Sequence, residues 1–371
     1  MLPFAGKAET TWQVEAVDTT GMGKYSSMQI DRDGNIHLAY VIDDGGHALK
    51  YACWDKRIRK WFTMLVANES GMCSLALDSK QHPHISFADY GSGFGAKLHH
   101  AYWDGSQWQE RPIRLDSEIV AYYNSIAFDQ NDNPSISFYE YRGPKDSEFA
   151  IRLRVVMYNG KYWEVRTVDG DGGSGKFNSM AADAKGGLHI GYGNVSAGDM
   201  RYAYWNGSSW ALEMVERHST EAATFLGYSA AIAVDKAGVP HVAYSDPNNR
   251  IIKYGVRRDG RWQIQGVEKI HGVAYPDRNS IALDDEGRVY ITYYDAGRGE
   301  LRMAFQDHDR WAVGVVDPNN CGFSSSAQIA GGEIWISYGS SLGAMKVAHT
   351  SVSALHEALQ ATARQMPPRS K

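Results

Sequence analysis

The residues best suited to acid–base chemistry lie where a repeated sequence pattern is interrupted. His99 and His100 stand where other copies of the pattern have a lysine and a tyrosine, and Tyr139 begins the longest insertion, which runs to Asp146. Imidazole and phenol groups can accept and donate protons, and an arginine can neutralise a carboxylate. If the protein cleaves its ligand, we therefore predict that His99, His100 and Tyr139 act in β-elimination of a uronate polysaccharide, with an arginine neutralising the carboxylate.

A second group of residues is predicted to bind the ligand. Arg278 stands at a position where other copies offer an aromatic residue, such as Tyr25 or Phe177. Aromatic faces stack on sugar rings, and the planar fork of an arginine matches a carboxylate. The predicted ligand-binding residues, all in the insertion or in long loops, are Tyr141, Arg142, His218, His271, Tyr275 and Arg278. The alternative for His99 and His100 is that they fill a gap between neighbouring copies of the pattern.

Seven tryptophans recur along the chain at intervals of 47 to 55 residues, and each begins a similar stretch of sequence. Each period contains four short segments in which apolar and polar residues alternate. A period near fifty with four such segments is typical of a β-propeller blade. We therefore predict an all-β, seven-bladed propeller over residues 1–350 and a helical tail over 351–371. The repeated tryptophans are Trp12, Trp61, Trp108, Trp163, Trp210, Trp262 and Trp311.

The order of the segments predicts how the ring closes. The chain starts with a lone outermost strand, Trp12–Val17, and its last repeat supplies only three strands, from Ser326 to Ala348. We expect Trp12–Val17 to pair with Met345–Ala348, which would leave no exposed sheet edge. The tail from Ser353 to Gln365 reads as a short amphipathic helix, either docked or frayed.

Residues that recur in most blades are expected to be structural, because one active site does not need several copies. Four aspartates at the end of the innermost strand are each followed six residues later by a histidine, and we predict that each pair forms a buried contact. These pairs are Asp31–His37, Asp78–His84, Asp183–His189 and Asp235–His241.

An acidic and a basic residue recur where the second and third strands of a blade meet. Asp246 is predicted to pair with Lys253 and Asp295 with Arg302, whereas Lys50 and Lys346 have no acid at the matching position. A local basic spot is therefore expected beside the closing strand.

Composition limits the partners and the compartment. The net charge of −5 and a pI near 6.2 argue against nucleic acid or an anionic membrane as a partner. Three cysteines with no paired spacing predict neither a disulfide framework nor a metal cluster, and no motif indicates a cofactor. No signal peptide is visible, so we expect a cytoplasmic monomer, although a secreted protein whose leader had been removed would look the same.

The blade sequence resembles a group of bacterial seven-bladed propellers whose blades read S-I-A-L-D-x-x-G-x-x-H-I-S-Y-x-D. Ser280–Asp284, His84–Asp89 and His241–Asp246 carry this resemblance. The overall plan is also similar to propellers of the ulvan-lyase type, which use His, Tyr and Arg residues from adjacent blades. That resemblance implies that His99 or His100, Tyr139 and Arg154 are the catalytic residues here. The paired histidines associated with that family are replaced here by Asp43-Asp44 and Asp89-Tyr90.

Three classes of function remain open at this stage. The first is a propeller with one asymmetric site at its axial mouth, which binds or cleaves a carbohydrate. The second is a non-catalytic scaffold for protein interactions, and the third is a lectin with equivalent sites on every blade. The S-x-D-x-G-x-T-W motif of sialidases does not occur in the sequence.

Overall fold

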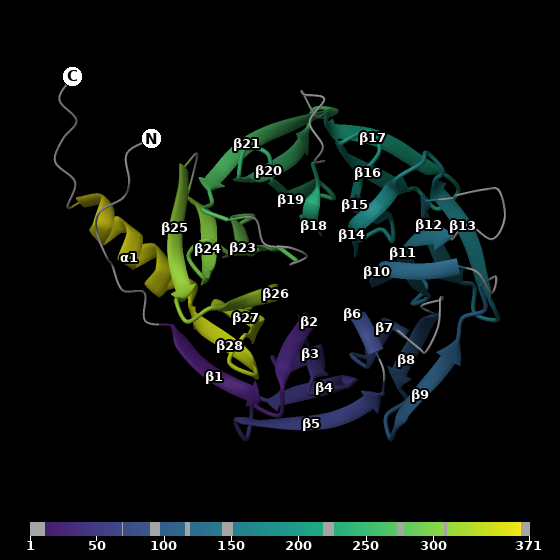
Figure 1. Ribbon diagram of the computed structural model, residues 1–371, viewed down its shortest axis with the longest axis horizontal. Coiled ribbons are helices and arrows are strands. Elements are labelled where there is room, and N and C mark those ends of the chain that lie inside the picture. The colour runs from purple at the N-terminus through teal and green to yellow at the C-terminus, as the bar shows by residue number, and fades with distance from the viewer. Residues whose placement is uncertain are drawn as a thin grey trace.

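A computed structural model describes residues 12–68, 70–89, 97–115, 119–142, 151–217, 226–272, 278–307 and 310–364. Seven four-stranded antiparallel sheets form a ring around a central axis (Figure 1), which confirms the predicted seven-bladed propeller. We number the blades one to seven by their inner strands in chain order. The single helix of the described residues, α1 (Val352–Arg364), follows the last strand.

Within each blade, the four strands are arranged in chain order from the axis outwards, except that the first strand of the chain is the outer strand of blade seven. The inner strands are β2 (Met22–Ile30), β6 (Ser70–Leu77), β10 (Ile119–Phe128), β14 (Ser174–Ala182), β18 (Tyr228–Val234), β22 (Ser280–Leu283) and β26 (Cys321–Ala330). The second strands are β3 (Ile36–Asp43), β7 (Pro83–Asp89), β11 (Pro134–Arg142), β15 (Leu188–Asn194), β19 (Pro240–Asp246), β23 (Val289–Asp295) and β27 (Glu333–Ser340).

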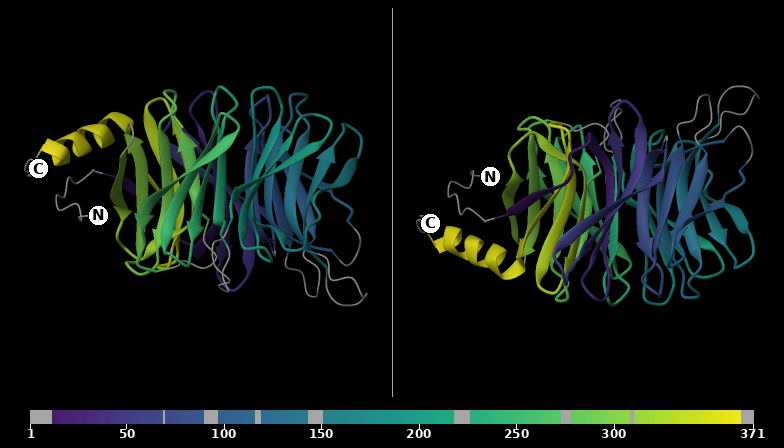
Figure 2. Two further views of the ribbon diagram at one scale, coloured as in Figure 1. Left: turned by 90° about the horizontal axis from the view of Figure 1, so that it is seen from above. Right: turned by 90° about the horizontal axis from the view of Figure 1, so that it is seen from below.

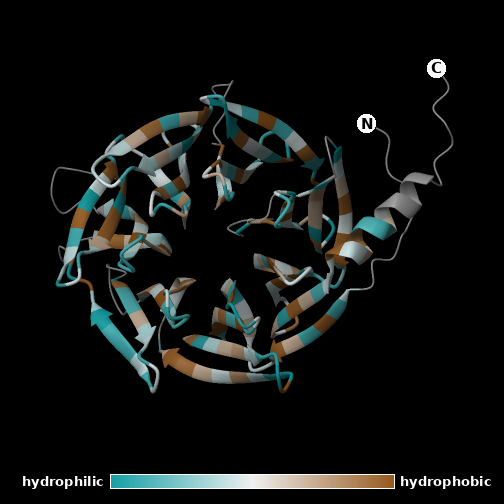
Figure 3. Ribbon diagram, turned by 180° about the vertical axis from the view of Figure 1, so that it is seen from behind, coloured by the Kyte–Doolittle hydropathy of each residue, from teal (hydrophilic) through white to brown (hydrophobic). Residues whose placement is uncertain are grey.

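The third strands are β4 (His47–Asp55), β8 (Leu98–Trp103), β12 (Ile151–Tyr158), β16 (Asp199–Trp205), β20 (Ile251–Arg258), β24 (Glu300–Asp307) and β28 (Ala344–Ser351). The outer strands of blades one to six are β5 (Lys60–Ala67), β9 (Trp108–Pro112), β13 (Trp163–Asp169), β17 (Trp210–Glu216), β21 (Arg261–Lys269) and β25 (Arg310–Asp317). The outer strand of blade seven is β1 (Gln13–Asp18). Apolar and polar residues alternate along the outer strands (Figure 3), because only one face of each is covered.

The antiparallel order gives the ring two distinct faces. The loops from the second to the third strand and those between blades lie on one face, which we call the mouth face. The turns from the first to the second strand and from the third to the fourth lie on the other, the turn face. Figure 2 shows the ring from the side, with α1 at its edge.

The closing strand lies where the sequence predicted it. β1 pairs antiparallel with β28, so that Val14 lies opposite Ala348 and Glu15 opposite Val347. The first strand of the chain therefore completes the sheet formed by its last three strands. The helix α1 is docked on blade six, where Leu355 is buried and the His356 ring stacks 5.3 Å from Phe305.

The inner strands begin earlier than the sequence pattern indicates in every blade except blade six. A bulge interrupts the pairing of each of these strands with the second strand. A residue in the left-handed backbone conformation forms the bulge in five of them. These residues are Tyr25, Tyr123, Phe177, Ser229 and Ser324, with φ between 49° and 54°.

The four predicted aspartate–histidine pairs are confirmed, with N–O separations of 3.2 to 3.7 Å. In blade one, Asp31 also accepts the backbone N–H groups of Asp33 and Asn35, which fixes the turn. His37 bridges Asp31 and the hydroxyl of Tyr51, which lies 2.6 Å from Nδ1. Burial is the main cause of the lowered pKa of His37, so this histidine is a neutral structural group.

Neighbouring blades are joined by a repeated set of three side chains. A carboxylate at the end of one outer strand accepts hydrogen bonds from a buried tyrosine and a basic residue of the next blade. At the closing strand, the Asp18 carboxylate lies 3.0 Å from the Tyr40 hydroxyl and 2.9 Å from Lys50 Nζ. The other sets are Asp169–Tyr192–Arg201, Glu216–Tyr244–Lys253, Glu268–Tyr293–Arg302 and Asp317–Tyr338–Lys346.

These sets correct part of the predicted charge pairing. Lys50 and Lys346 do have acidic partners, so the expected basic spot beside the closing strand is wrong. The Arg302 guanidinium bonds Glu268 and Glu300 rather than Asp295, whereas the pair Lys253–Asp246 is confirmed at 2.9 Å. Asp18, Glu268 and Asp317 were missed because they lie on the preceding blade rather than in the same hairpin.

Both boundaries of blade two lack this set of three side chains. The matching positions hold Ala67, Phe87 and His99 at the boundary with blade one. They hold Arg114, Phe138 and Arg154 at the boundary with blade three. Among the described residues, blade two is therefore held by apolar packing and by other hydrogen bonds, such as those from Ser86 to Asn124 and from Ser79 to Asp132.

A ring of serines links the inner strands around the axis. Each serine Oγ accepts a hydrogen bond from a backbone N–H of the next blade, at 2.9 to 3.4 Å. The donor and acceptor pairs are Leu75–Ser27, Ile126–Ser74, Met180–Ser125, Ile232–Ser179, Ala327–Ser280 and Met28–Ser326. Blade five has Ala231 at this position, and an alanine offers no hydroxyl to Ile281 of the next blade.

Replacing Ala231 with serine should complete the ring. One additional hydrogen bond contributes about 0.5–1.5 kcal/mol, so we expect Ala231→Ser to raise the free energy of unfolding by that amount. Chemical denaturation measures the change, provided that the dependence of the unfolding free energy on denaturant concentration is the same for both proteins. Ser280→Ala, which removes an existing hydrogen bond, is the matched control and should be destabilising. An unchanged or lower stability of Ala231→Ser would contradict the proposed role of the serines.

Removing residues 1–18 should open the ring. Blade seven would lose its outer strand, and Tyr40 and Lys50 would lose their partner carboxylate. We expect loss of cooperative unfolding in circular dichroism and a rise in aggregation, because β28 becomes an exposed edge. Deletion of residues 365–371 is the control. A cooperative transition that survives removal of β1 would show that closure is dispensable.

Candidate functional site

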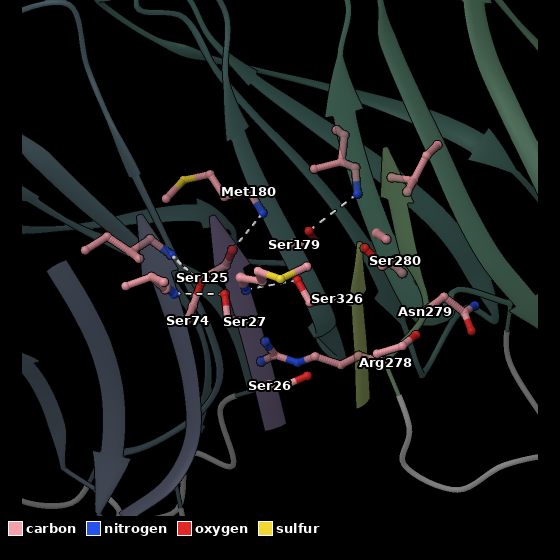
Figure 4. Close-up of a pocket in the computed structure, with 18 of the residues that line it drawn as sticks. Ser26, Ser27, Ser74, Ser125, Ser179, Met180, Arg278, Asn279, Ser280 and Ser326 are labelled. Carbon is pink, nitrogen blue, oxygen red and sulfur yellow. Dashed lines mark hydrogen bonds between the residues drawn. The ribbon is translucent and has the colours of Figure 1, made fainter. Parts of the chain in front are cut away.

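The seven inner strands enclose a narrow channel on the axis with a volume of about 150 Å³. Its lining is polar because the ring serines and the residues before them, among them Asn178 and Asn279, face the axis. Arg278 is the one charged residue among the described residues that line the channel. Figure 4 shows its side chain reaching across the channel towards Ser26 and Ser74.

Arg278 joins opposite sides of the ring. It comes from the loop before β22 of blade six, at the position of the bulge residues in other blades. Its Nη1 donates to the carbonyl of Cys73 at 3.3 Å, and its Nη2 donates to the carbonyl of Asn124 at 3.1 Å. The guanidinium therefore bridges blades two and three from the far side of the axis, and places a positive charge at the mouth.

Aromatic residues gather beside Arg278 on blades three to five. The Tyr123 ring lies 6.0 Å from Tyr139 and 4.6 Å from Phe177, and Phe177 lies 5.1 Å from Tyr228. The Lys176 ammonium lies 5.5 Å from the centre of the Phe177 ring, and burial lowers the pKa of this lysine. Phe177 and Tyr228 are buried, whereas Tyr123 is half-buried. We call Tyr123, Tyr139, Phe177 and Tyr228 the aromatic arc.

Tyr139 is the predicted catalytic residue that lies nearest the mouth. Its side chain is 8 % exposed, and burial, helped by the nearby Tyr141, raises its pKa to about 12. The phenol is therefore protonated at neutral pH and can donate a proton, but it does not act as a base unless a ligand lowers its pKa.

Arg154 lies on the other side of the same sheet. It is opposite Phe138 in the pairing of β11 with β12, whereas Tyr139 is opposite Leu153. Successive side chains of a strand point to opposite faces, so Arg154 faces blade two and Tyr139 faces blade four. The Arg154 guanidinium bonds the buried Glu140 at 2.8 Å within its own blade.

His99 is held inside blade two by carboxylates. Its Nε2 lies 3.1 Å from Asp89, its Nδ1 contacts Glu110, and its ring stacks on Phe87 at 4.8 Å. The side chain is 22 % exposed. Both ring nitrogens are therefore engaged, which leaves neither available to take a proton from a substrate.

His100 is completely buried between blades two and three. It takes the place of Tyr51, since its Nε2 lies 2.9 Å from Nδ1 of His84, and its ring meets Trp163 edge-on at 5.4 Å. Burial, reinforced by His84, lowers the pKa of His100 well below the ordinary value. The packing alternative describes this geometry, and catalysis by His100 stays a prediction without geometric support.

The four predicted catalytic residues are therefore not brought together. Among the described residues, no hydrogen bond, ion pair or ring contact joins any two of His99, His100, Tyr139 and Arg154. The sequence placed them correctly in blades two and three, but it could not assign the face of the sheet from which each one projects.

The predicted ligand-binding residues divide into three groups. Arg278 lies in the channel and Tyr141 is half-buried on β11. His271 is exposed on the mouth face, with Nδ1 3.4 Å from Asp295. His218, Tyr275 and the side chain of Arg142 lie outside the described residues.

The sequence reasoning missed Tyr228 of the arc and Lys176 beside it. A signal for Tyr228 was available, because Phe177 and Tyr228 both stand shortly before the small residues of the inner strand, Ser179 and Ala231, in consecutive blades. Within the described part of the chain, no group of three His, Cys, Asp or Glu residues could hold a metal ion, and the three cysteines are free thiols. In the same residues, no helix has the length and apolar character needed to cross a membrane.

Comparison with known proteins relates this chain to others by fold. No protein-family model and no curated protein sequence matches it. A solved structure described as a PL25 ulvan lyase is 13% identical, with a TM-score of 0.59, and the match covers 92% of this chain and 98% of that one. The polysaccharide lyase Uly1 is 11% identical, with a TM-score of 0.53 and 88% and 89% coverage.

A sialidase is also similar in fold. The intramolecular trans-sialidase from Ruminococcus gnavus is 12% identical, with a TM-score of 0.52, and the match covers 95% of this chain and 99% of that chain. At these identities the similarity extends to the architecture of the ring and not to individual site residues.

The buried pair His84–His100 should make the protein sensitive to acid. Burial lowers the pKa of both histidines, so the unfolded chain takes up protons first as the pH falls below 6.5. Their contribution to stability is complete above pH 6.5 and decreases below it. We expect His100→Tyr, which copies Tyr51, to gain stability relative to the parent between pH 7 and pH 5, by at most about 1.4 kcal/mol per pH unit.

Chemical denaturation of both proteins across this pH range measures the difference. His100→Phe is the control, because it removes the titrating group but offers His84 no hydroxyl, and it should be less stable than His100→Tyr at every pH. Parallel pH profiles for the parent and His100→Tyr would contradict the role given to the pair.

Proposed function

We propose that this protein binds an acidic carbohydrate at the axial mouth. The observation that carries the proposal is Arg278, the charged group that lines the channel, set beside the aromatic arc of blades three to five. The site is asymmetric, since the bulge positions of blades five and seven hold Ser229 and Ser324.

The chemistry of these groups suits a sugar that carries a carboxylate. An arginine offers several N–H donors in one plane, and a carboxylate accepts two of them in parallel. The half-buried ring of Tyr123 can pack against the apolar face of a sugar, and the serine hydroxyls and the amide of Asn279 lining the channel can bond its hydroxyl groups. The channel volume of about 150 Å³ suits insertion of one sugar unit rather than a whole chain.

Binding is better supported than cleavage. β-Elimination needs a base that removes a proton beside the carboxylate, and Tyr139 is protonated at neutral pH. His99 is held by two carboxylates and His100 is buried. Cleavage is a second candidate because Tyr139 borders the arc and because two proteins of similar fold are described as polysaccharide lyases.

A glycan array followed by calorimetry tests the proposal. We expect oligosaccharides that contain uronic acids to bind more tightly than neutral ones of equal length. Arg278→Gln should weaken the binding of the acidic ligand at least tenfold, because it removes both the charge and the fork. Arg278→Lys should recover part of the affinity, since it keeps the charge alone.

Arg310→Gln is the matched control, because it removes an equal charge from an exposed residue on the turn face. The ultraviolet absorbance of unsaturated uronates, followed with the same ligands and with Tyr139→Phe, separates binding from cleavage. Equal binding of neutral and acidic glycans, or an Arg278→Gln protein that binds as the parent does, would overturn the proposal. No binding on the array would favour the protein-interaction scaffold.

A further inference from the structure

A second cavity lies on the turn face, between blades two and three, away from the mouth. Its volume is about 280 Å³, larger than that of the axial channel. It is lined by turn residues of both blades and by the ends of β8 and β12. The lining residues that matter for its chemistry are Asp78, Tyr102, Trp103, Arg111, Asp132 and Tyr158.

Arg111 is held rigidly at this cavity by two aromatic rings. Its guanidinium carbon lies 4.8 Å from the centre of the Tyr102 ring and 4.3 Å from that of Tyr158. The cation is therefore stacked between tyrosines of two neighbouring blades. No hydrogen bond or ion pair joins this guanidinium to any residue that the structure describes, although five N–H groups line its edge.

The repeat explains why Arg111 is unusual. Three residues after the blade tryptophan, three outer strands place an acceptor that bonds the indole N–H of the next blade, whereas blades one and six have Met64 and Gly314 at this position. Gln265 accepts from Trp311 at 3.0 Å. Glu15 and Glu213 act in the same way towards Trp61 and Trp262.

Blade two replaces this acceptor by a donor. Arg111 stands at that position, and the buried indole N–H of Trp163 in blade three has no acceptor among the described residues. Among the described residues, this interface therefore leaves two N–H-bearing groups without an acceptor: the Arg111 guanidinium, which lines the cavity, and the buried indole of Trp163. A ligand that supplies negatively charged oxygens would correct this imbalance.

The same cavity offers acceptors at its rim. Asp132 accepts the backbone N–H and the hydroxyl of Ser79, and Asp78 accepts the backbone N–H groups of Lys80 and His82. Each Asp132 oxygen accepts one of these bonds and can accept another, and both bonds to Asp78 end on Oδ1, which leaves Oδ2 as its acceptor. A bare anion would be repelled by these aspartates, whereas a molecule that carries both hydroxyl groups and a carboxylate could bond them and Arg111 together.

We propose that this cavity is a second binding site, which takes a small hydroxylated carboxylate of the size of one uronic acid. The Arg111 fork binds the carboxylate, and Asp78 and Asp132 accept hydrogen bonds from the hydroxyl groups. The site is separate from the mouth and does not depend on what the mouth binds.

Arg166 provides a matched comparison within the chain. It occupies the same position in the next blade, and Trp210 likewise has a buried indole N–H without an acceptor among the described residues. The Arg166 guanidinium, however, bonds Glu164 at 2.9 Å and lies 5.1 Å from the Trp205 ring. Its charge is already paired, so it is not expected to bind the same ligand.

Titration with sodium glucuronate, followed through the indole N–H resonance of Trp103 in nuclear magnetic resonance spectra, tests the proposal. Trp103 lines this cavity and not the channel, so the signal reports on one site. We expect a saturable shift in the parent protein, in Arg166→Gln and in Arg278→Gln. In Arg111→Gln the affinity should fall at least tenfold, while the fold is retained, because Gln265 shows that glutamine can serve at this position.

Glucose lacks the carboxylate and acetate lacks the hydroxyl groups, so each should bind more weakly than glucuronate. Glucose binding as tightly as glucuronate, Arg111→Gln binding as the parent does, or the absence of any Trp103 shift would overturn the proposal. Failure of Arg111→Gln alone leaves the mouth proposal intact, because the two arginines lie on different faces and are tested by different variants.

Discussion

Each blade of this protein is fixed by groups that belong to its neighbour, and this dependence shapes every other feature. Near the axis, a serine oxygen accepts a hydrogen bond from a backbone N–H of the next blade. Farther out, an acid at the end of one outer strand binds a tyrosine and a cation of the next blade, as Asp317 does with Tyr338 and Lys346. The same contacts occur at the closing strand, where Asp18 serves blade one.

The acid–tyrosine–cation set also shows how a charged carboxylate can be buried between blades. Burial alone would raise the pKa of Asp18, but hydrogen bonds from Thr20, Lys50 and Tyr40 lower it overall, so the carboxylate remains charged inside the ring. Burial and the nearby Asp18 charge raise the pKa of Tyr40, so its hydroxyl stays protonated. A fully bonded polar group of this kind specifies one arrangement of neighbouring blades.

Much of this architecture could be predicted from the sequence because it repeats. The tryptophan period gave the number of blades, and the incomplete last repeat gave the pairing of β1 with β28. Contacts within one repeat, such as Asp31 with His37, were also within reach. Contacts between repeats were not, since the acid that binds Lys50 lies 32 residues earlier, before the blade begins.

The candidate site was harder to predict for a geometric reason. Arg278 was identified as an irregular residue, but its partners lie 205 and 154 residues away, across the axis. Adjacent residues of one strand, such as His99 and His100, face different blades and therefore cannot share one substrate. The spacing of residues in the sequence identifies the irregular blades. The face of the sheet on which each side chain lies follows only from the register of the paired strands.

The irregular features converge on blades two and three from different directions. Arg278 bonds backbone carbonyls of these blades at the axis, and Arg111 lies between their tyrosines on the turn face. Both boundaries of blade two have also lost the acid–tyrosine–cation set, which elsewhere fixes neighbouring blades. At these boundaries the charged residues pair within their own blade, as Arg154 does with Glu140. The residues that face the neighbouring blade can therefore change without breaking a buried ion pair between blades. The missing acid–tyrosine–cation sets and the two arginine sites are thus connected. Groups that bind a ligand can accumulate at these boundaries because the ring does not depend there on the side chains that join its other blades.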